Sequence, residues 1–315
     1  MNSLRLPLSS AFLLLVALVV PARSQEGNYD WDKARKLADG IEYTDAHHVL
    51  KNAAGFKCPY YKDFDPKKPR ELRVYVLRID TRQPSLRIAI TGRAKGWGEP
   101  MPEFEGRTLD QYAIRTERQT TADFLRQVRT DSRDALVAVN AQTWDPLFEA
   151  GFDNPYADRM GLTISDGILV SLPSRAPALF ISTNGLVDMK MTDFDMDLSG
   201  IAQAVGGLTF CLVDGEPSEP DDVLHPRTGY GLCRQKRYLV LLVIDGRQSA
   251  SLGASVHEVG LWLRHYGSHT GINMDGGGSS TMVRWDQGKE KVEVLNRPRS
   301  GERRVGGNLA VYRVP

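Results

Sequence analysis

The sequence has few cysteines, no surplus of either charge and no long apolar run after residue 25, and each shortage excludes a class of protein. Its 315 residues include 3 cysteines, too few for a disulfide scaffold. Lys and Arg total 40 against 39 Asp and Glu, so the basic surface typical of nucleic-acid binders is missing. The remaining class is an ordinary globular protein, 41% hydrophobic and 25% charged, with ample material for a core.

The three cysteines leave two interpretations open. Cys211 and Cys233 could pair in an oxidising compartment and leave Cys58 free, or all three could be partly buried thiols. Their spacing does not indicate a metal site.

The first 24 residues have the three-part layout of a secretory signal peptide. Arg5 precedes an apolar core at residues 11–20, and small residues at Ala22 and Ser24 suit a signal peptidase. An uncleaved membrane anchor is the alternative, but the run is shorter than the ~20 residues that span a bilayer. We therefore expect an exported protein, secreted, periplasmic or at the cell surface, with no stable membrane span once the signal is removed.

Residues 25–70 form an N-terminal lead-in segment in this interpretation, and residues 71–315 form one domain. Within the lead-in, residues 30–40 predict a short helix that ends at Gly40. Strands predominate from Leu72 onward, with hairpin turns at Asp166-Gly167 and Asn184-Gly185. The pattern predicts a single α+β domain in which a mixed sheet packs against a few helices.

Three segments of this domain carry strong local signals. Residues 238–244 are apolar on both faces, which predicts a central strand in a covered sheet. Residues 121–134 predict a helix. A second helix is predicted after Ser255, because Glu258 stands at the capping-box spacing and Gly267 provides the stop.

Four predicted strands end in Asp-Gly, at Asp166, Asp214, Asp245 and Asp275. Hairpin chemistry accounts for Asp166, and Asp214 is an intermediate case because a long loop follows it. Asp245 and Asp275 have no return strand two residues later. A carboxylate at the end of a buried strand, opening into a polar loop, is a candidate for binding or catalysis.

The loop after Asp275 has the composition of an anion-binding site. It consists of Gly276, Gly277 and Gly278, followed by Ser279 and Ser280. Consecutive glycines let backbone N–H groups converge on an anion, and the hydroxyls add donors. An acid beside such a cradle suits a phosphate-bearing substrate, whereas the alternative is a glycine-rich bulge. Neither a nucleotide-binding phosphate loop nor a serine-hydrolase elbow is present.

A second polar cluster lies in residues 224–231, "LHPRTGYG". Arg227 could grip a phosphate with two hydrogen bonds, and His225 would titrate near neutral pH. The alternative is a solvated surface loop. Glu258 is better explained by the capping box than as half of a glycosidase pair, and His265 and His269 are better explained as structural than as metal ligands.

Several segments, in order, resemble the phosphodiester glycosidase family: "AVGGLTFCLVDGEP", "HPRTGYG", "VIDGRQ", "NMDGGGSSTMV" and "RRVGGNLAVY". The resemblance runs from roughly Leu72 to Tyr312. It implies hydrolysis of a sugar joined through its anomeric carbon to a phosphodiester, on an α+β domain with a curved, largely antiparallel sheet. One departure is that the family commonly has two glycines after the asparagine that ends the buried strand, where this chain has Ala141 and Gln142 after Asn140.

The resulting hypothesis is an exported hydrolase that cleaves the anomeric C–O bond of a sugar-1-phosphodiester, with a carbohydrate phosphodiester as its partner and no nucleic acid. The candidate catalytic residues are Asp275, Asp245 and His225. The candidate substrate- and phosphate-binding residues are Arg227, Thr228, Arg247, Gly276, Gly277, Gly278, Ser279, Ser280 and Asn140. No cofactor is expected. The alternatives are a non-catalytic glycan-binding module and a phosphodiesterase with a divalent cation on Asp245 and Asp275.

Overall fold

The computed structural model describes residues 27–146 and 154–314, and it is mostly β. Strand accounts for 43% of the structure and helix for 9%, with two α-helices in the described residues. The expected α+β class with a mixed sheet and a few packed helices is therefore wrong. Every pairing between two named strands is antiparallel, including those of the central strands of the largest sheet. Many strands are short, and β5 (Pro100–Phe104) contains two prolines, so such segments lack the apolar alternation that sequence patterns detect.

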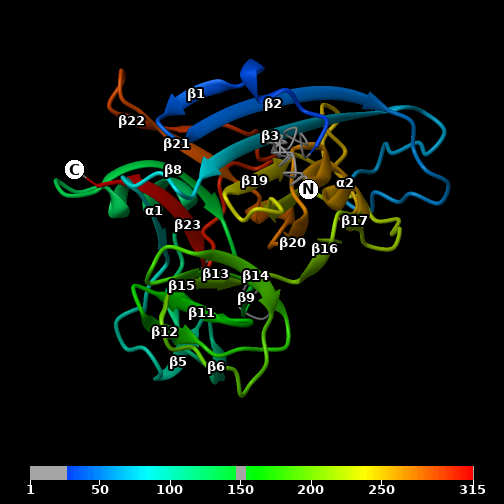
Figure 1. Cartoon of the computed structure of the whole chain (residues 1–315). Coiled ribbons are helices and arrows are strands. Elements are labelled where there is room, and N and C mark those ends of the chain that lie inside the picture. The colour runs from blue at the N-terminus through cyan, green and yellow to red at the C-terminus, as the bar shows by residue number, and fades with distance from the viewer. Residues whose placement is uncertain (1–26, 147–153, 315) are drawn as a thin grey trace, which may run out of the picture.

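The largest sheet has eight strands (Figure 1). Its order across the sheet is β1 (Arg35–Ala38), β2 (Ile41–Leu50), β3 (Arg70–Asp80), β19 (Tyr238–Ile244), β18 (Arg227–Leu232), β20 (Thr270–Asn273), β16 (Thr209–Val213) and β17 (Glu216–Pro217). The predicted central position of β19 is confirmed, since six of its seven residues are buried. Helix α2 (Val256–His265) packs on one face and begins with the predicted capping box of Ser255 and Glu258.

The helix predicted over residues 30–40 is wrong. A single 3-10 turn, η1 (Trp31–Lys33), is followed by β1, which pairs with β2 across a turn at Gly40. Leu37 and Ala38 pack against the main core instead of lining a helix face. Pairing with a strand of the sheet overrides helix propensity here, and the glycine that predicted a helix stop is a hairpin residue with φ 77°.

A second sheet has five strands, in the order β22 (Lys291–Val294), β21 (Met282–Asp286), β8 (Asp134–Asn140), β23 (Asn308–Arg313) and β4 (Leu86–Ile90). Helix α1 (Thr121–Val128) covers its outer face through Phe124, Leu125 and Val128. Its inner face meets the large sheet, where Val139 and Leu309 share one buried cluster with Leu241. The two sheets thus form a sandwich whose core holds both in place.

The lower part of the molecule in Figure 1 is built on a third sheet, in the order β12 (Ile168–Ser171), β11 (Thr163–Ser165), β15 (Ile201–Gly206), β13 (Pro177–Ser182) and β14 (Val187–Met191). The hairpins predicted at Asp166-Gly167 and Asn184-Gly185 are confirmed as β11–β12 and β13–β14. Two small sheets complete the fold, β7 (Thr116–Glu117) with β10 (Tyr156–Arg159) and β9 (Trp144–Asp145), and β5 with β6 (Arg107–Ala113).

Two further expectations concern export and the thiols. The predicted signal peptide, residues 1–24, lies outside the described residues. Within residues 27–146 and 154–314, neither helix has the length and apolar character needed to span a bilayer. The three cysteines are buried and unpaired, so the interpretation as free thiols is the correct one.

Strand order brings the candidate residues together at one end of three central strands of the large sheet. In the order β19, β18, β20, all neighbours are antiparallel, so the start of β18 lies beside the ends of β19 and β20. Arg227 is paired with Ile244, the residue before Asp245, and Gly229 is paired with Asn273, two residues before Asp275. Topology alone therefore gathers the two carboxylates that the sequence singled out.

Candidate active site

The glycine run begins three residues after the end of β20 and turns through η2 (Gly277–Ser279). Gly277 has φ 63°, a conformation that favours glycine. A Cβ at Gly276 would lie 2.8 Å from the Pro226 carbonyl oxygen, and one at Gly277 would lie 3.1 Å from Arg247 Nη2. A Cβ at Gly278 would overlap the Arg303 guanidinium. The glycines thus make room for two arginines that approach the bare backbone.

This finding changes the expected form of the anion cradle. The Gly277 amide donates to the Pro226 carbonyl at 2.8 Å, and the Ser279 amide donates to the Gly276 carbonyl at 3.2 Å. These two amides therefore hold the loop together. The main groups available to an anion here are the guanidinium groups of the two arginines that pack on the loop.

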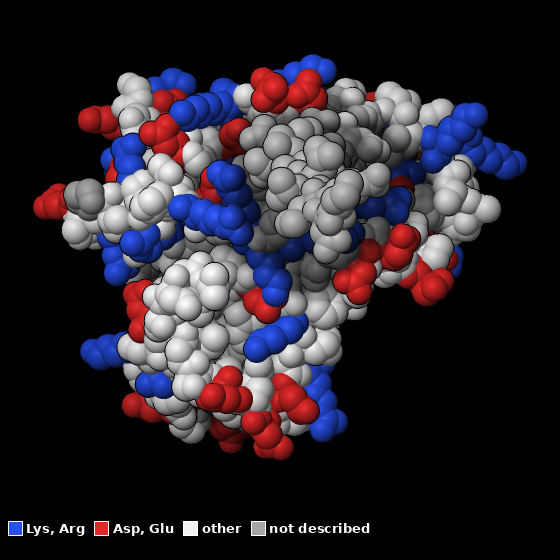
Figure 2. Space-filling view, viewed as in Figure 1, with Lys and Arg blue, Asp and Glu red and all other residues white. Residues whose placement is uncertain are grey.

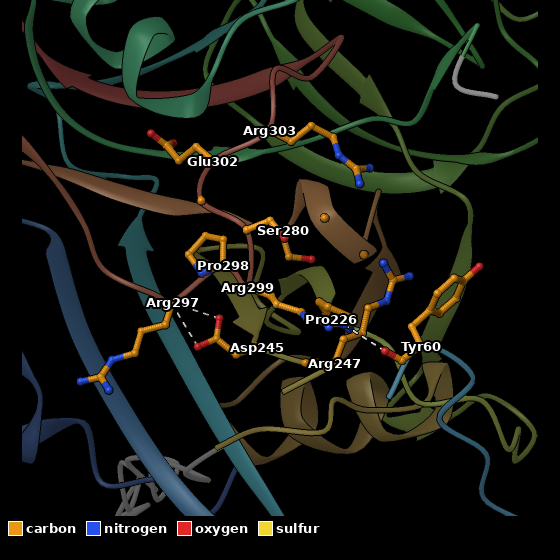
Figure 3. Close-up of a pocket in the computed structure, with 15 residues that line it drawn as sticks. Tyr60, Pro226, Asp245, Arg247, Ser280, Arg297, Pro298, Arg299, Glu302 and Arg303 are labelled. Atoms are coloured by element: carbon orange, nitrogen blue, oxygen red, sulfur yellow. Dashed lines mark hydrogen bonds between the residues drawn. The ribbon is translucent and has the colours of Figure 1, made fainter. Parts of the chain in front are cut away.

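A cavity of about 500 Å³ opens over this loop (Figure 3). Five of its lining residues were candidates from sequence: Gly277, Gly278, Ser280, Asp245 and Arg247. The Ser280 hydroxyl is buried and has no hydrogen-bond partner among the described residues, so it is available to a ligand.

The opposite wall of the cavity is a segment that sequence reasoning missed. Residues 297–304, "RPRSGERR", connect β22 to β23, and we call them the arginine segment. Figure 3 shows the Arg303 side chain directed toward Arg247, whereas the Arg297 side chain points away from both. Burial lowers the pKa of Arg247, and the nearby charges of Arg303 and Arg299 add to this effect. Like charges crowded in this way favour an anionic ligand. The high arginine content of this segment was the feature of the sequence that could have identified it as part of the site.

Basic side chains also gather on the face of the molecule drawn in Figure 2. Figure 2 shows Lys and Arg gathered in the hollow between the upper sandwich and the lower sheet. The chain is close to neutral overall, so this grouping is a property of the fold rather than of composition.

Asp275 is half-buried beside the glycine loop and is fixed by its backbone. Its amide donates to the Ala141 carbonyl at 3.0 Å, and its carbonyl accepts from Asn140 Nδ2 at 2.7 Å. Burial raises the pKa of the Asp275 carboxyl to about 6, although Ser279, Arg303, the Gly276 amide and Arg159 act in the opposite direction. The carboxyl is therefore mostly ionised at pH 7 and titrates within the physiological range.

Asp245 lines the cavity, but its oxygens are engaged by the fold. It accepts from Asn296 Nδ2 at 2.9 Å. It also accepts from the Arg297 amide at 3.1 Å, a contact drawn in Figure 3. It is 2% exposed, and burial raises its pKa despite these hydrogen bonds. Its evident task is to hold the start of the arginine segment in place.

His225 does not titrate near neutral pH as expected. Burial, followed by the charges of Arg227 and Arg247, lowers its pKa to about 4. Its Nδ1 lies 3.2 Å from Arg247 Nη2, so the neutral ring accepts a hydrogen bond from that arginine. His225 thus holds Arg247 and does not supply a proton at pH 7.

Arg227, Thr228 and Asn140 lie behind the cavity and do not line it. Arg227 donates to the carbonyls of Ala254 at 2.9 Å and Val223 at 3.0 Å. Thr228 and Asn140 are fully buried. Asn140 Oδ1 accepts from Thr228 Oγ1 at 2.8 Å and from the Thr281 amide at 3.1 Å. These three residues therefore support the loop, and this geometry gives no support to their predicted contact with substrate.

Replacing Asn140 with alanine is expected to destabilise the fold by about 3 kcal/mol, because it leaves a buried amide and a buried hydroxyl unpaired. Urea unfolding of Asn140→Ala measures the change. The matched control is Asn184→Ala in the exposed β13–β14 turn, with an expected loss below about 1 kcal/mol. Equal losses in the two variants would contradict the supporting role.

The described residues contain no group of three or more His, Cys, Asp or Glu side chains placed to hold a metal ion. His269 lies 3.4 Å from Asp214, and His265 packs against Tyr29 and Trp262 in an aromatic cluster. Their spacing in the sequence thus reflects separate structural contacts.

Guanidinium groups thus lie on both walls of the cavity, and an ionisable carboxylate adjoins the glycine loop. The phosphodiester glycosidase family model matches residues 133–312, and the chain belongs to this family. It is accordingly a glycosidase-type hydrolase. No curated protein matches the chain.

Several solved structures share the fold, among them the following three. A zebrafish N-acetylglucosamine-1-phosphodiester alpha-N-acetylglucosaminidase catalytic domain, auto-inhibited by its pro-peptide, has a TM-score of 0.58 and 18% identity over 90% of this chain and 86% of that one. A hypothetical protein from Synechocystis has a TM-score of 0.55 and 12% identity over 87% and 62%. A putative exported protein from Burkholderia pseudomallei has a TM-score of 0.52 and 15% identity over 79% and 75%. At these identities the likeness concerns the fold alone.

Proposed function

We propose that this protein hydrolyses the bond between the anomeric carbon and the phosphate oxygen of a sugar-1-phosphodiester. The observation that carries the proposal is the pairing of Arg247 and Arg303 over Gly277 and Gly278, directly beside Asp275. Two guanidinium groups hold a phosphodiester well, because each presents several donors in a rigid plane. Membership of the family also supports the proposal.

The reaction divides into simple roles. Water adds to the anomeric carbon as the C–O bond breaks. The electron pair of this bond leaves with the phosphate oxygen, and one proton of the water passes to solvent. Arg247 and Arg303 stabilise the departing phosphomonoester. The ionised Asp275 stabilises the positive charge that develops at the anomeric carbon, an interaction strengthened by the desolvation of this carboxylate. His225 and Asp245 act through the groups that they hold.

Hydrolysis in heavy-oxygen water tests which bond breaks. Cleavage at carbon places the label on the anomeric hydroxyl of the free sugar, whereas cleavage at phosphorus places it on phosphate. We expect the label on the sugar, measured by mass spectrometry with a panel of sugar-1-phosphodiesters. Label on phosphate would identify a phosphodiesterase. Saturable binding without any product would identify a binding module.

Export forms part of the proposal and depends on residues 1–24, with a mature chain that starts near Gln25. N-terminal sequencing of the protein outside the cytoplasm checks it, and a retained signal segment would contradict it.

A further inference from the structure

Arg159, in β10, is a buried arginine whose hydrogen bonds all go to neutral oxygens. It is 5% exposed. Its Nε and Nη2 donate to Gln142 Oε1 at 3.0 Å and 2.6 Å, and its Nη1 donates to the Gly306 carbonyl at 2.7 Å. None of the carboxylates in the described residues forms an ion pair with it. Burying a charge without a partner of opposite sign costs free energy, so the presence of this arginine needs a reason.

Gln142 is the residue that holds Arg159 in place. Its Oε1 also accepts from Thr163 Oγ1, and its Nε2 donates to the Met160 carbonyl at 2.6 Å. The side chain is fully buried, so its hydrogen bonds are those of the fold. Gln142 stands at one of the two positions where the sequence departs from the glycines common in the family. The side chain found here in place of a glycine is thus the carrier of a buried arginine.

Backbone contacts connect Arg159 with Asp275. A Cβ at Gly307 would overlap the Arg159 guanidinium, so the arginine packs directly on this glycine. The Gly307 carbonyl accepts from the Ala141 amide at 2.9 Å, and the Ala141 carbonyl accepts from the Asp275 amide at 3.0 Å. Two backbone hydrogen bonds therefore separate the glycine under the guanidinium from the acid.

The charges of Arg159 and Asp275 act on each other. Burial lowers the pKa of Arg159 to about 9, and the charge of Asp275 acts in the opposite direction, so the guanidinium stays protonated at pH 7. Tyr230, in β18, also faces Arg159, and burial raises its pKa so that it stays neutral. The other charged groups near Asp275 include Arg303, whose charge has the larger effect, and Arg247, which lies against the glycine loop.

These cations differ in what a substrate does to them. A phosphate bound by Arg247 and Arg303 would oppose their charge, whereas Arg159 is buried and does not line the cavity. We propose that Arg159, held by Gln142, is a positioning residue of this site, whose permanent positive charge keeps the Asp275 carboxylate ionised and in place while the phosphate is bound. This inference rests on the proposed function, which requires an ionised Asp275.

The acid side of the pH profile of kcat tests the proposal. Losing a positive charge beside a carboxyl raises its pKa, so Arg159→Met should move this acid limb to higher pH by about half a pH unit, less than Arg303→Gln does. Gln142→Glu should move it in the same direction, because the new carboxylate pairs with Arg159 and neutralises it. Thr163→Val is the matched control. It removes a hydrogen bond to the same Gln142 oxygen without changing any charge, and should leave the limb in place.

A titration that needs no substrate separates this inference from the proposed function. In protein with isotope-labelled aspartate carboxyl carbons, the NMR signal of Asp275 is the one missing from Asp275→Asn. Its midpoint should rise in Arg159→Met and in Gln142→Glu. If no sugar-1-phosphodiester is cleaved, the proposed function fails and this titration still decides the inference.

Two results would overturn the inference. One is an Asp275 midpoint that stays in place in both charge-changing variants, which would mean that Arg159 has no influence on the acid. The other is an equal rise in Thr163→Val, which would mean that the network acts only through packing. Thermal unfolding shows which variants are folded. If Arg159→Met does not fold, Gln142→Glu decides, because it keeps acceptors for the Arg159 hydrogen bonds.

Discussion

Replacing Asp275 with asparagine is expected to lower kcat about a thousandfold. The amide has nearly the same shape, so the substrate still binds, but it carries no charge to stabilise the anomeric carbon in the transition state. The effect is large because the carboxylate is desolvated, and charges interact more strongly where water is excluded. Steady-state kinetics of Asp275→Asn on a sugar-1-phosphodiester measures it.

The pH profile provides the second measurement on Asp275. Its pKa is raised to about 6, so the reactive ionised form is lost as pH falls through that value. We expect the kcat of the parent protein to fall on the acid side near pH 6, and the variant to lack this limb. Thermal unfolding should show the variant to be folded. A variant with near-parental turnover would remove Asp275 from the mechanism.

Replacing Arg303 with glutamine is expected to lower kcat/KM about a hundredfold, because the phosphate loses one of two guanidinium partners. The same change should move the acid limb. The positive charge of Arg303 lowers the pKa of Asp275, so its removal raises that pKa and shifts the limb to higher pH.

The matched control lies in the same segment. The side chain of Arg297 points away from the other arginines in Figure 3, and Asp245 contacts its backbone amide rather than its guanidinium. Arg297→Gln should therefore change kcat/KM by less than about twofold. Similar losses in both variants would mean that the segment acts through its overall charge. If the acid side of the pH profile does not shift in Arg303→Gln, Arg303 does not influence the pKa of Asp275.

Local structure was predictable where one short segment carries the whole signal. The turns at Asp166 and Asn184, the cap at Ser255 and the apolar strand β19 all follow from residues close together in sequence. The helix predicted for residues 30–40 was wrong because pairing with β2 overrides the local helix propensity of this segment. The fold class failed for the same reason, since short polar strands form only when a neighbour pairs with them.

The candidate site shows the same division. The sequence patterns identified Gly277, Gly278 and Arg247, which line one cavity, and Asp275, which adjoins the same glycine loop. Arg227 and Asn140 have equally suggestive sequence contexts, but their polar atoms are used by the fold. Arg159 and Arg303 lie far from Asp275 in sequence, and no local pattern connects them with it.

By itself, the sequence determined which residue types stand together: an acid, then three residues without side chains, then hydroxyls. Only the tertiary structure decided what fills the space that those glycines leave. Two arginines from different segments occupy it, one from the loop after β19 and one from the connection between β22 and β23. The reason is physical, because a glycine specifies the absence of a side chain, and the neighbour that uses this absence is set by strand order and packing.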